Sequence, residues 1–263
     1  MNIIVCLKQV PDTADVKINP ETNTLVREGI KNITNPFDTY ALEEGVRLRE
    51  RFGGKVTVIS MGPSQAEMIL REALACGADE AVLLSDRAFA GADTLATSYT
   101  LAKAVKKLAP YDLVICGRQT IDGDTGQVGP EIAEVLAVPF VAYVSEVKEI
   151  DEEGMRVKRM VENGYEIIES SLPAVISVVK EINTPRLPSL RGQMRARSAA
   201  VPVWTVHDLG IPEEAVGLAG SATRVIKIFY PQRVSRAEIL SGDPEKQVTS
   251  LLEKLQESGI IQG

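Results

Sequence analysis

Histidine and cysteine are scarce in this chain, and their scarcity excludes several kinds of catalytic and metal site. His207 is the only histidine among 263 residues, so no Ser/His/Asp set can be assembled. Cys6, Cys76 and Cys116 include no C-x-x-C pair, which argues against a disulfide framework, a structural zinc or an iron–sulfur cluster. The motif G-x-x-x-x-G-K-[ST], and G-x-G-x-x-G after the first strand, are also missing, which excludes a P-loop phosphotransferase and a standard Rossmann dehydrogenase. Any chemistry therefore has to be supplied by a bound cofactor.

An excess of basic residues and a long apolar run are missing as well. The net charge is −7 and the isoelectric point is near 5.0, which argues against a surface built to bind nucleic acid. No apolar run reaches the roughly 18 to 20 residues that cross a bilayer, so we expect no transmembrane segment. The N-terminus enters an apolar strand pattern at once, without a visible secretory signal, and we therefore expect a cytoplasmic protein.

The first half of the chain alternates apolar runs with amphipathic stretches. We predict strands at residues 1–7, 55–61, 80–84 and 112–116, each followed by a helix, at residues 38–52, 64–77, 93–108 and 126–135. This alternation predicts a mostly parallel open sheet with helices on both faces, a three-layer α/β fold of the flavodoxin or Rossmann kind. Asp38 and Asp93 stand where helix N-caps are expected, and Ser64 with Glu67 has the spacing of a capping box.

The second half departs from this pattern. Residues 143–170 alternate apolar and charged positions, which predicts an antiparallel hairpin appended to the sheet, and a buried strand follows at 173–179. Residues 183–202 are rich in Arg, Ser and Pro without a clear period, so we interpret them as an ordered loop or a partner-facing segment. Two strand-like runs, 203–206 and 224–229, precede a helix at 243–256 that Asp243 should cap. We therefore expect an α/β domain at 1–202, with a docking loop at about 183–197, and an arm at 203–263.

The stretch from Gly117 to Pro130 is the strongest candidate for a binding site. Its four glycines, between a strand and a helix, allow close approach of a bulky anion to the main chain. The amides of residues 125–128 would face a pyrophosphate, with Thr120, Thr125 and Gln127 as side-chain partners. Asp122 and Asp124 would repel phosphate and are better suited to accept from ribose hydroxyls or to cap the helix. The alternative is a tight turn without a ligand.

Two further patches have a structural and a functional interpretation. Asp93 to Ser98 places Thr94, Thr97 and Ser98 in the first turns of a helix, where capping by small residues is the simpler explanation. Residues 185–194 set Leu187, Leu190 and Met194 among arginines, as either a solvated loop or a docking surface.

Several motifs together resemble the β subunit of electron transfer flavoprotein over essentially the whole chain. They are Val5 to Asp12 (VCLKQVPD), Asn35 to Asp38 (NPFD), Met61 to Pro63 (MGP), the loop Gly117 to Pro130, Leu172 to Val175 (LPAV) and the segment 185–194. The resemblance implies a heterodimer with an α subunit that carries FAD, onto which the arm of the β subunit wraps. It also implies that Leu190 anchors an acyl-CoA dehydrogenase. The implied cofactor site holds AMP in simple electron carriers and a second FAD in bifurcating members, and it consists of Cys6, Asn35, Asp38, Met61, Gln119, Thr120, Ile121, Asp122, Gly123, Asp124, Thr125, Gly126, Gln127 and Val128.

Three features resemble the electron-bifurcating branch of this family: the stretch 93–98, the Asp122-Gly-Asp124 form of the loop, and residues 217–221 (GLAGS). Ala222-Thr223, where Pro-Thr is expected, and Phe37 depart from the pattern. The branch implies that NADH reduces a β-bound FAD, with Asp93, Thr94 and Thr97 near its ring or ribityl chain. One electron would then pass to the α-subunit FAD and one to ferredoxin or flavodoxin. The alternatives are a simple carrier with structural AMP and a nucleotide-binding stress-type module.

Overall fold

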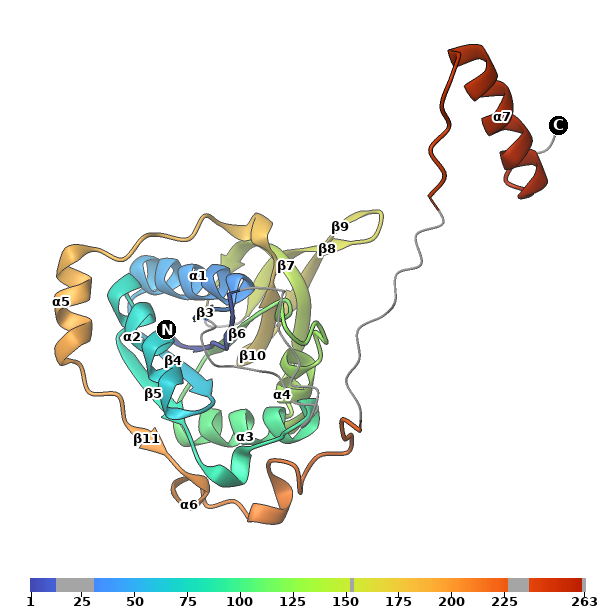
Figure 1. Cartoon of the computed structure of the whole chain (residues 1–263). Helices are drawn as coiled ribbons and strands as arrows, with labels where there is room; N and C mark the ends of the chain where they lie inside the picture. The colour runs from blue at the N-terminus through green and yellow to red at the C-terminus, as the bar shows by residue number, and fades with distance from the viewer. Residues whose placement is uncertain (13–30, 152–153, 227–236, 262–263) are drawn as a thin grey trace. The chain divides into compact units, whose positions relative to one another are not determined.

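The structure is a computed structural model of the chain, and it describes all residues except 13–30, 152–153, 227–236 and 262–263 (Figure 1). The described chain divides into two compact units, Met1–Ile226 and Lys227–Gly263. The first unit contains the sheet, and the second contains one helix, α7 (Pro244–Glu257). In the described part of the chain, no helix is long and apolar enough to cross a membrane.

A nine-stranded sheet forms the centre of the first unit. Strands neighbour one another parallel from β11 to β7, and the last two pairs are antiparallel, which confirms the predicted fold class and the appended hairpin. Their order across the sheet is β11 (Val203–Trp204), β5 (Glu80–Leu84), β4 (Lys55–Met61), β1 (Asn2–Cys6), β6 (Leu113–Gly117), β10 (Ala174–Val178), β7 (Phe140–Ile150), β8 (Met155–Val161) and β9 (Gly164–Ser170).

Helices cover both faces of this sheet, so the apolar core is split in two (Figure 1). Successive side chains of a strand point to opposite faces. Accordingly, Val5 of β1 packs in one core and Ile4 in the other, and both are buried. The core around Val5 contains side chains of α1 (Pro36–Phe52), α2 (Glu67–Cys76) and α5 (Leu190–Ser198). The other contains side chains of α3 (Thr94–Lys107), α4 (Val128–Leu136) and α6 (Val206–Leu209).

Local capping differs from prediction at two helices. Helix α1 begins at Pro36 with Asn35 as its N-cap residue, so Asp38 lies inside the first turn and is not the cap. A 3₁₀ turn, η1 (Ser64–Ala66), precedes α2, and Ser64 and Glu67 form no capping box. Asp93 does cap α3, as predicted, by accepting a hydrogen bond from the amide of Ala96. The side chains of Asn35 and Asp38 are engaged elsewhere, as shown below.

The predicted loop at residues 183–202 contains the helix α5, and the 3₁₀ turn η3 (Lys180–Ile182) ends just before it. The hydroxyl of Ser189 caps α5 by accepting from the amide of Gly192. The helix α5 could not be predicted from the sequence because only Ala196 of its nine residues is buried, so it has no apolar period. A small antiparallel pair, β2 (Gln9–Pro11) and β3 (Asn32–Thr34), also went unpredicted.

The remaining elements of the described chain are two short 3₁₀ turns and the helix of the second unit. Three-residue 3₁₀ turns form at η2 (Arg87–Phe89) and η4 (Glu213–Ala215). In the second unit α7 confirms the predicted late helix, with Pro244 in its first turn, although Asp243 makes no side-chain capping bond. Its apolar residues Val248, Leu251 and Leu252 are exposed. Residues 224–226 are not in a strand, and the rest of the predicted run to 229 lies outside the described residues.

Candidate functional site

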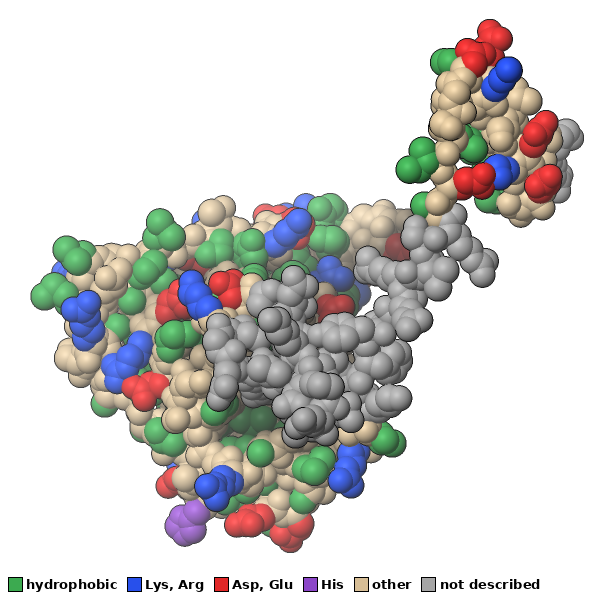
Figure 2. All heavy atoms as spheres, in the orientation of Figure 1, with side chains coloured by type: hydrophobic (Ala, Val, Ile, Leu, Met, Phe, Trp, Pro, Cys, Tyr) green, Lys and Arg blue, Asp and Glu red, His purple; other side chains and the backbone are tan. Residues whose placement is uncertain are grey.

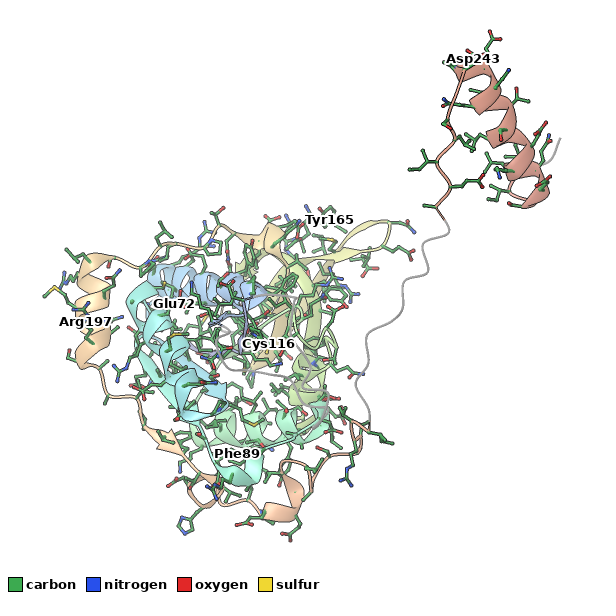
Figure 3. The ribbon with its side chains drawn as sticks, viewed as in Figure 1. Glu72, Phe89, Cys116, Tyr165, Arg197 and Asp243 are labelled. Carbon is green, nitrogen blue, oxygen red and sulfur yellow. The ribbon has the colours of Figure 1, made fainter. Side chains whose placement is uncertain are left out.

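The candidate site lies at the carboxyl edge of the sheet, where ligands of open α/β sheets bind. The ends of β1, β4 and β6 meet there, and the glycine loop (residues 117–130) leads from β6 into α4. Cys116, labelled in Figure 3, is the penultimate residue of β6. Lys8, just beyond β1, reaches the carboxylate of Asp122 in the loop at 2.8 Å. Gln9 donates from Nε2 to the carbonyl of Gln65 beyond β4, at 3.1 Å, so the segments that follow β1, β4 and β6 contact one another at this edge.

Asn35 holds the start of the glycine loop from beneath. Its side chain is fully buried, and its Nδ2 donates to the carbonyl oxygen of Gln119 and to Oδ1 of Asp38, both at 2.9 Å. Its Oδ1 accepts a hydrogen bond from the amide of Ile121 at 3.2 Å. One amide side chain therefore pairs with the main chain on both sides of Thr120, which fixes the course of the loop across the end of the sheet.

Asp38 in turn orients Asn35. Its carboxylate also accepts from the amide of Lys8 at 2.7 Å. Burial raises the pKa of Asp38 from its ordinary value of 3.8 to about 7, and this effect outweighs the hydrogen bonds from Asn35, Lys8 and Gly117, which lower it. Gly117 is required here because a Cβ at this position would lie 2.3 Å from Oδ1 of Asp38.

Cys6 and Cys116 lie side by side on β1 and β6 and form the apolar floor of the site. The two residues are in register, both are buried, and both belong to the core on the α3 and α4 side. The pKa of the Cys6 thiol is raised by its hydrogen bond to Cys116 and by burial. Cys6 therefore remains an uncharged thiol, and both residues are free and buried in the structure.

The outer part of the glycine loop is exposed and directs donors outward. Asp124 and Gly126 have positive φ angles of 54° and 63°, and the amide of Asp124 donates to the carbonyl of Thr120 at 2.9 Å. The amides of residues 125–127 donate to no other group in the part of the chain that the structure describes. Successive free amides before the start of a helix suit an anionic group.

The two loop aspartates are already paired within the protein. Burial opposes the charge of Asp122, but the hydrogen bonds and positive charge of Lys8, with help from Thr120, lower its pKa. Asp124 accepts a hydrogen bond from Nε2 of Gln119. Neither caps α4, whose N-cap residue is Gln127, so that alternative for the two aspartates is wrong.

Asp93 and Thr94 are tied to two other parts of the chain. Oδ2 of Asp93 accepts from the amide and the hydroxyl of Thr223 at 2.8 and 3.0 Å, and its amide donates to Oγ of Ser221 at 2.8 Å. The hydroxyl of Thr94 lies 3.0 Å from Oε1 of Glu131 in α4. The predicted stretch 93–98 therefore meets both residues 217–223 and the start of α4, which no local signal indicated. Thr97 is half-buried one turn further along α3.

Met61 ends β4 and is half-buried. The remaining predicted loop residues, Thr120, Gly123, Thr125, Gln127 and Val128, are exposed or half-buried along the same edge. This donor set fits the ADP half of a nucleotide cofactor, because outward-facing amides, hydroxyls and small residues lie over an uncharged floor. Leu190 does not belong to this group; it is exposed on α5.

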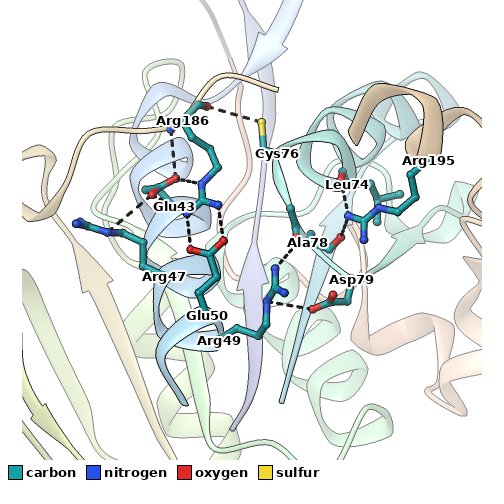
Figure 4. Close-up of polar contacts among 11 residues, drawn as sticks. Glu43, Arg47, Arg49, Glu50, Leu74, Cys76, Ala78, Asp79, Arg186 and Arg195 are labelled. Carbon is teal, nitrogen blue, oxygen red and sulfur yellow. Dashed lines mark hydrogen bonds and ion pairs between the residues drawn. The ribbon is translucent and has the colours of Figure 1, made fainter. Parts of the chain in front are cut away.

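A cavity of about 690 Å³ lies away from this edge. Its walls combine the ends of α1 and α2 with the segment that we name the arginine strap (residues 183–199), and they include Arg49, Arg186, Arg191 and Arg195. Figure 4 shows the polar contacts of Arg49, Arg186 and Arg195. Most of these guanidinium groups bind carboxylates or carbonyls of the protein itself. The charge in this cavity is therefore largely satisfied within the protein, in contrast to the free amides of the glycine loop.

Known proteins are similar to this sequence over almost its whole length. The family described as "Electron transfer flavoprotein domain" matches residues 22–209. The electron transfer flavoprotein subunit beta of Thermoanaerobacterium thermosaccharolyticum is 52% identical over 262 residues, covering 99% of this chain and 100% of the relative. The caffeyl-CoA reductase-Etf complex subunit CarD of Acetobacterium woodii is 49% identical over 263 residues, with coverage of 99% and 100%. Protein FixA of Azotobacter vinelandii is 44% identical over 265 residues, with coverage of 97% and 94%.

Proposed function

This chain belongs to the electron transfer flavoprotein β-subunit family, and on that premise we propose that it binds FAD at the glycine loop and takes electrons from NADH. With its α subunit it divides these electrons between the α-subunit FAD, which serves an acyl-CoA dehydrogenase-type acceptor, and ferredoxin or flavodoxin. The observation that carries the proposal is the meeting of residues 93–97 with residues 217–223 and with α4 beside the glycine loop. This meeting supports the proposal because it would bring hydroxyl and carboxyl groups close to the part of the cofactor beyond its ADP half.

The chain's own residues divide the work of holding the cofactor. The free amides of residues 125–127 receive the pyrophosphate, while Asn35 keeps the start of the loop in place. Cys6 and Cys116 exclude water and charge from the floor. The hydroxyls of Thr94 and Thr97, at the start of α3, would face the reactive ring. Bound FAD supplies the hydride acceptance and the transfer of single electrons that no side chain of this protein provides.

The partners are assigned from exposed apolar surface. Leu190 and Met194 of α5 are 77% and 66% exposed, and the arginine strap around them has no acidic residue. Such a surface complements an apolar pocket with acidic neighbours on an acyl-CoA dehydrogenase-type partner. That one relative is named as a subunit of a caffeyl-CoA reductase complex supports an acceptor of this class. The exposed apolar residues of α7 supply the contact with the α subunit.

Nucleotide analysis of the reconstituted heterodimer tests the proposal. The heterodimer with the α subunit should release two FAD molecules and become reduced by NADH. One FAD and one AMP would instead make this chain the subunit of a simple electron carrier.

A pair of glycine variants tests whether the second FAD binds at the glycine loop. Gly126 has a φ of 63°, a backbone conformation that valine strongly disfavours. Gly126→Val should therefore shift the loop amides that face the pyrophosphate and remove one of the two FAD molecules. Gly210 has a φ of 61°, and a Cβ added there would have no atom within 4 Å. Gly210→Val therefore imposes similar backbone strain far from the loop and should retain both FAD molecules. Equal FAD content in the two variants would contradict the glycine loop as the site.

A further inference from the structure

The arginine strap projects apolar side chains although it has almost no core of its own. Leu187, Leu190 and Met194 are 88%, 77% and 66% exposed, and only Ala196 is buried between residues 183 and 199. Figure 2 shows hydrophobic side chains beside basic ones over α5. Burial of apolar surface therefore does not hold this segment in place, and its order has to come from polar contacts with α1 and α2.

Arg186 makes the first of these contacts (Figure 4). Its guanidinium group binds two carboxylates of α1, at 2.7 Å from Nε to Glu43 and at 2.6 Å from Nη1 to Glu50. Its amide also donates to Glu43, at 3.2 Å. These bonds raise the pKa of Arg186 and lower that of Glu50. Just before it, Asn183 donates to Glu44 and to the carbonyl of Tyr40, both at 3.0 Å, so the entry to the strap is fixed on α1.

Two more arginines hold the far end of the strap on α2. Arg195, on α5, donates to the carbonyls of Leu74 and Ala78, each at 2.7 Å. Arg71, on α2, donates in the opposite direction, to the carbonyls of Ala196 at 2.6 Å and Ala199 at 3.3 Å. Glu72 and Arg197 in Figure 3 mark these two helices. The contacts close the strap over the cavity described above.

The remaining arginines of the strap have a different environment. In the described chain, the side chains of Arg191 and Arg197 form no salt bridge, and both residues are exposed. Arg71, Arg186 and Arg195 are instead directed to groups of the protein itself. The basic residues of this region therefore fall into an inner set that orders the strap and an outer set that is free to meet a partner.

We propose that Arg71, Arg186 and Arg195 are positioning residues for docking: they order the strap in advance, so that Leu190 is presented without the conformational entropy loss that a loose segment would suffer on binding. Ordering a free segment costs conformational entropy, and binding is weakened by whatever part of that entropy remains to be lost when the partner binds. The inference rests on the proposed docking role of Leu190. It adds a role for residues that make no contact with the partner: they determine how tightly the partner binds to this surface.

The test uses the heterodimer with FAD and an acyl-CoA dehydrogenase as the electron acceptor. In the double variant Glu50→Gln/Arg71→Met, the strap loses the ion pair between Arg186 and Glu50 at one end and the hydrogen bonds from Arg71 at the other. The ion pair between Arg186 and the buried Glu43 remains. Lys55→Met, which removes an exposed ion pair with Glu80 away from the strap, is the matched control. Leu190→Ala measures the docking contact itself, and Arg191→Gln/Arg197→Gln measures the outer charges.

We expect the double variant to raise KM for the dehydrogenase and the Kd of the complex about five- to tenfold. Its kcat, its reduction by NADH and the salt dependence of association should match those of Lys55→Met. The outer-arginine variant should instead flatten the salt dependence, because exposed charges act mainly on the association rate. A purely structural role would not separate KM from kcat in this way.

Two outcomes would overturn the inference, and they are distinguishable. If Leu190→Ala weakens docking but Glu50→Gln/Arg71→Met behaves as Lys55→Met does, the positioning role is wrong while the docking surface stands. If Leu190→Ala also leaves Kd unchanged, the docking surface itself is wrong, and the inference is lost with it. Neither outcome affects the nucleotide content measured for the heterodimer.

Discussion

The glycine loop and the arginine strap are both irregular segments held by side chains from elsewhere in the fold, but the groups that hold them differ in charge. Asn35 and Asp38 hold the loop, and burial brings the pKa of Asp38 to about 7. Guanidinium groups, which stay charged at all ordinary pH values, hold the strap. The residues that hold the proposed cofactor site therefore include a group that titrates near neutrality, whereas the guanidinium groups that hold the proposed docking surface do not titrate there.

The largest expected effect is the pH dependence contributed by Asp38. Between its unfolded pKa of 3.8 and its folded pKa of about 7, the folded protein binds a proton that the unfolded chain has released. Its stabilising contribution is therefore full below about pH 4 and falls, by at most about 4 kcal/mol, as the pH rises to 7. Asp38→Asn should flatten urea-unfolding free energies across this window, whereas Asp12→Asn, at an exposed site, should not. An unchanged pH profile in Asp38→Asn would remove the contrast between loop and strap.

Arg186→Met should destabilise the protein by about 3 kcal/mol, the lower end of the range for a buried ion pair, since Arg186 is itself 34% exposed. Among the described residues, Glu43, which is 7% exposed, then keeps an ion pair only with Arg47 at 3.9 Å, beside the hydrogen bond from the backbone amide of residue 186. Arg186→Lys should recover part of the loss, because an ammonium group cannot bind two carboxylates as the planar guanidinium does. Denaturant unfolding measures both variants. A loss below about 1 kcal/mol in Arg186→Met would place this contact with ordinary surface pairs.

Gly117→Ala tests how closely the glycine loop is packed onto its support. The new Cβ would meet Oδ1 of Asp38 at 2.3 Å, and we expect a cost of about 2 kcal/mol from the forced shift. At Gly123 the nearest atom to an added Cβ is Oγ1 of Thr120 at 3.5 Å, so Gly123→Ala should change the unfolding free energy little. Similar values for the two variants would show that Asp38 does not sit against the main chain of the loop.

The smallest expected effect belongs to the ion pair between Lys8 and Asp122. It has the same chemistry as the strap contacts, but its side chains are 45% and 32% exposed. Lys8→Met should cost about 0.5 kcal/mol or less, and added salt should reduce that difference further. Unfolding at low and high salt measures it. A cost comparable to that of Arg186→Met would mean that the loop depends on this ion pair and not on Asn35.

The order of most elements could be predicted because those strands and helices have their own apolar period, which α5 lacks. The parallel sheet, the hairpin and α7 follow from such local patterns, and the structure confirms them. The glycine loop was found because glycine density is visible in a single stretch of sequence. That its residues hold FAD stays a prediction.

The supports of the loop and strap could not be predicted, because they join residues far apart in sequence. Glu43 reads as a surface residue four positions before Arg47, yet it is buried and binds Arg186, 143 residues away. Arg71 and Arg195 donate to backbone carbonyls, which every residue carries and which therefore leave no signal in the sequence. Asp93 was recognised as a cap, but its bonds to Ser221 and Thr223 depend on the same long-range packing.

Those bonds to Asp93 also determine where this protein can be cut or spliced. A chain shortened to residue 202 would lack β11, α6 and both residues that hold the N-cap of α3. A chain ending at Ile226 keeps the whole first unit, including Thr223. The junction for exchanging the C-terminal helix with that of a relative therefore lies just after Ile226, where a foreign segment can be joined without loosening α3.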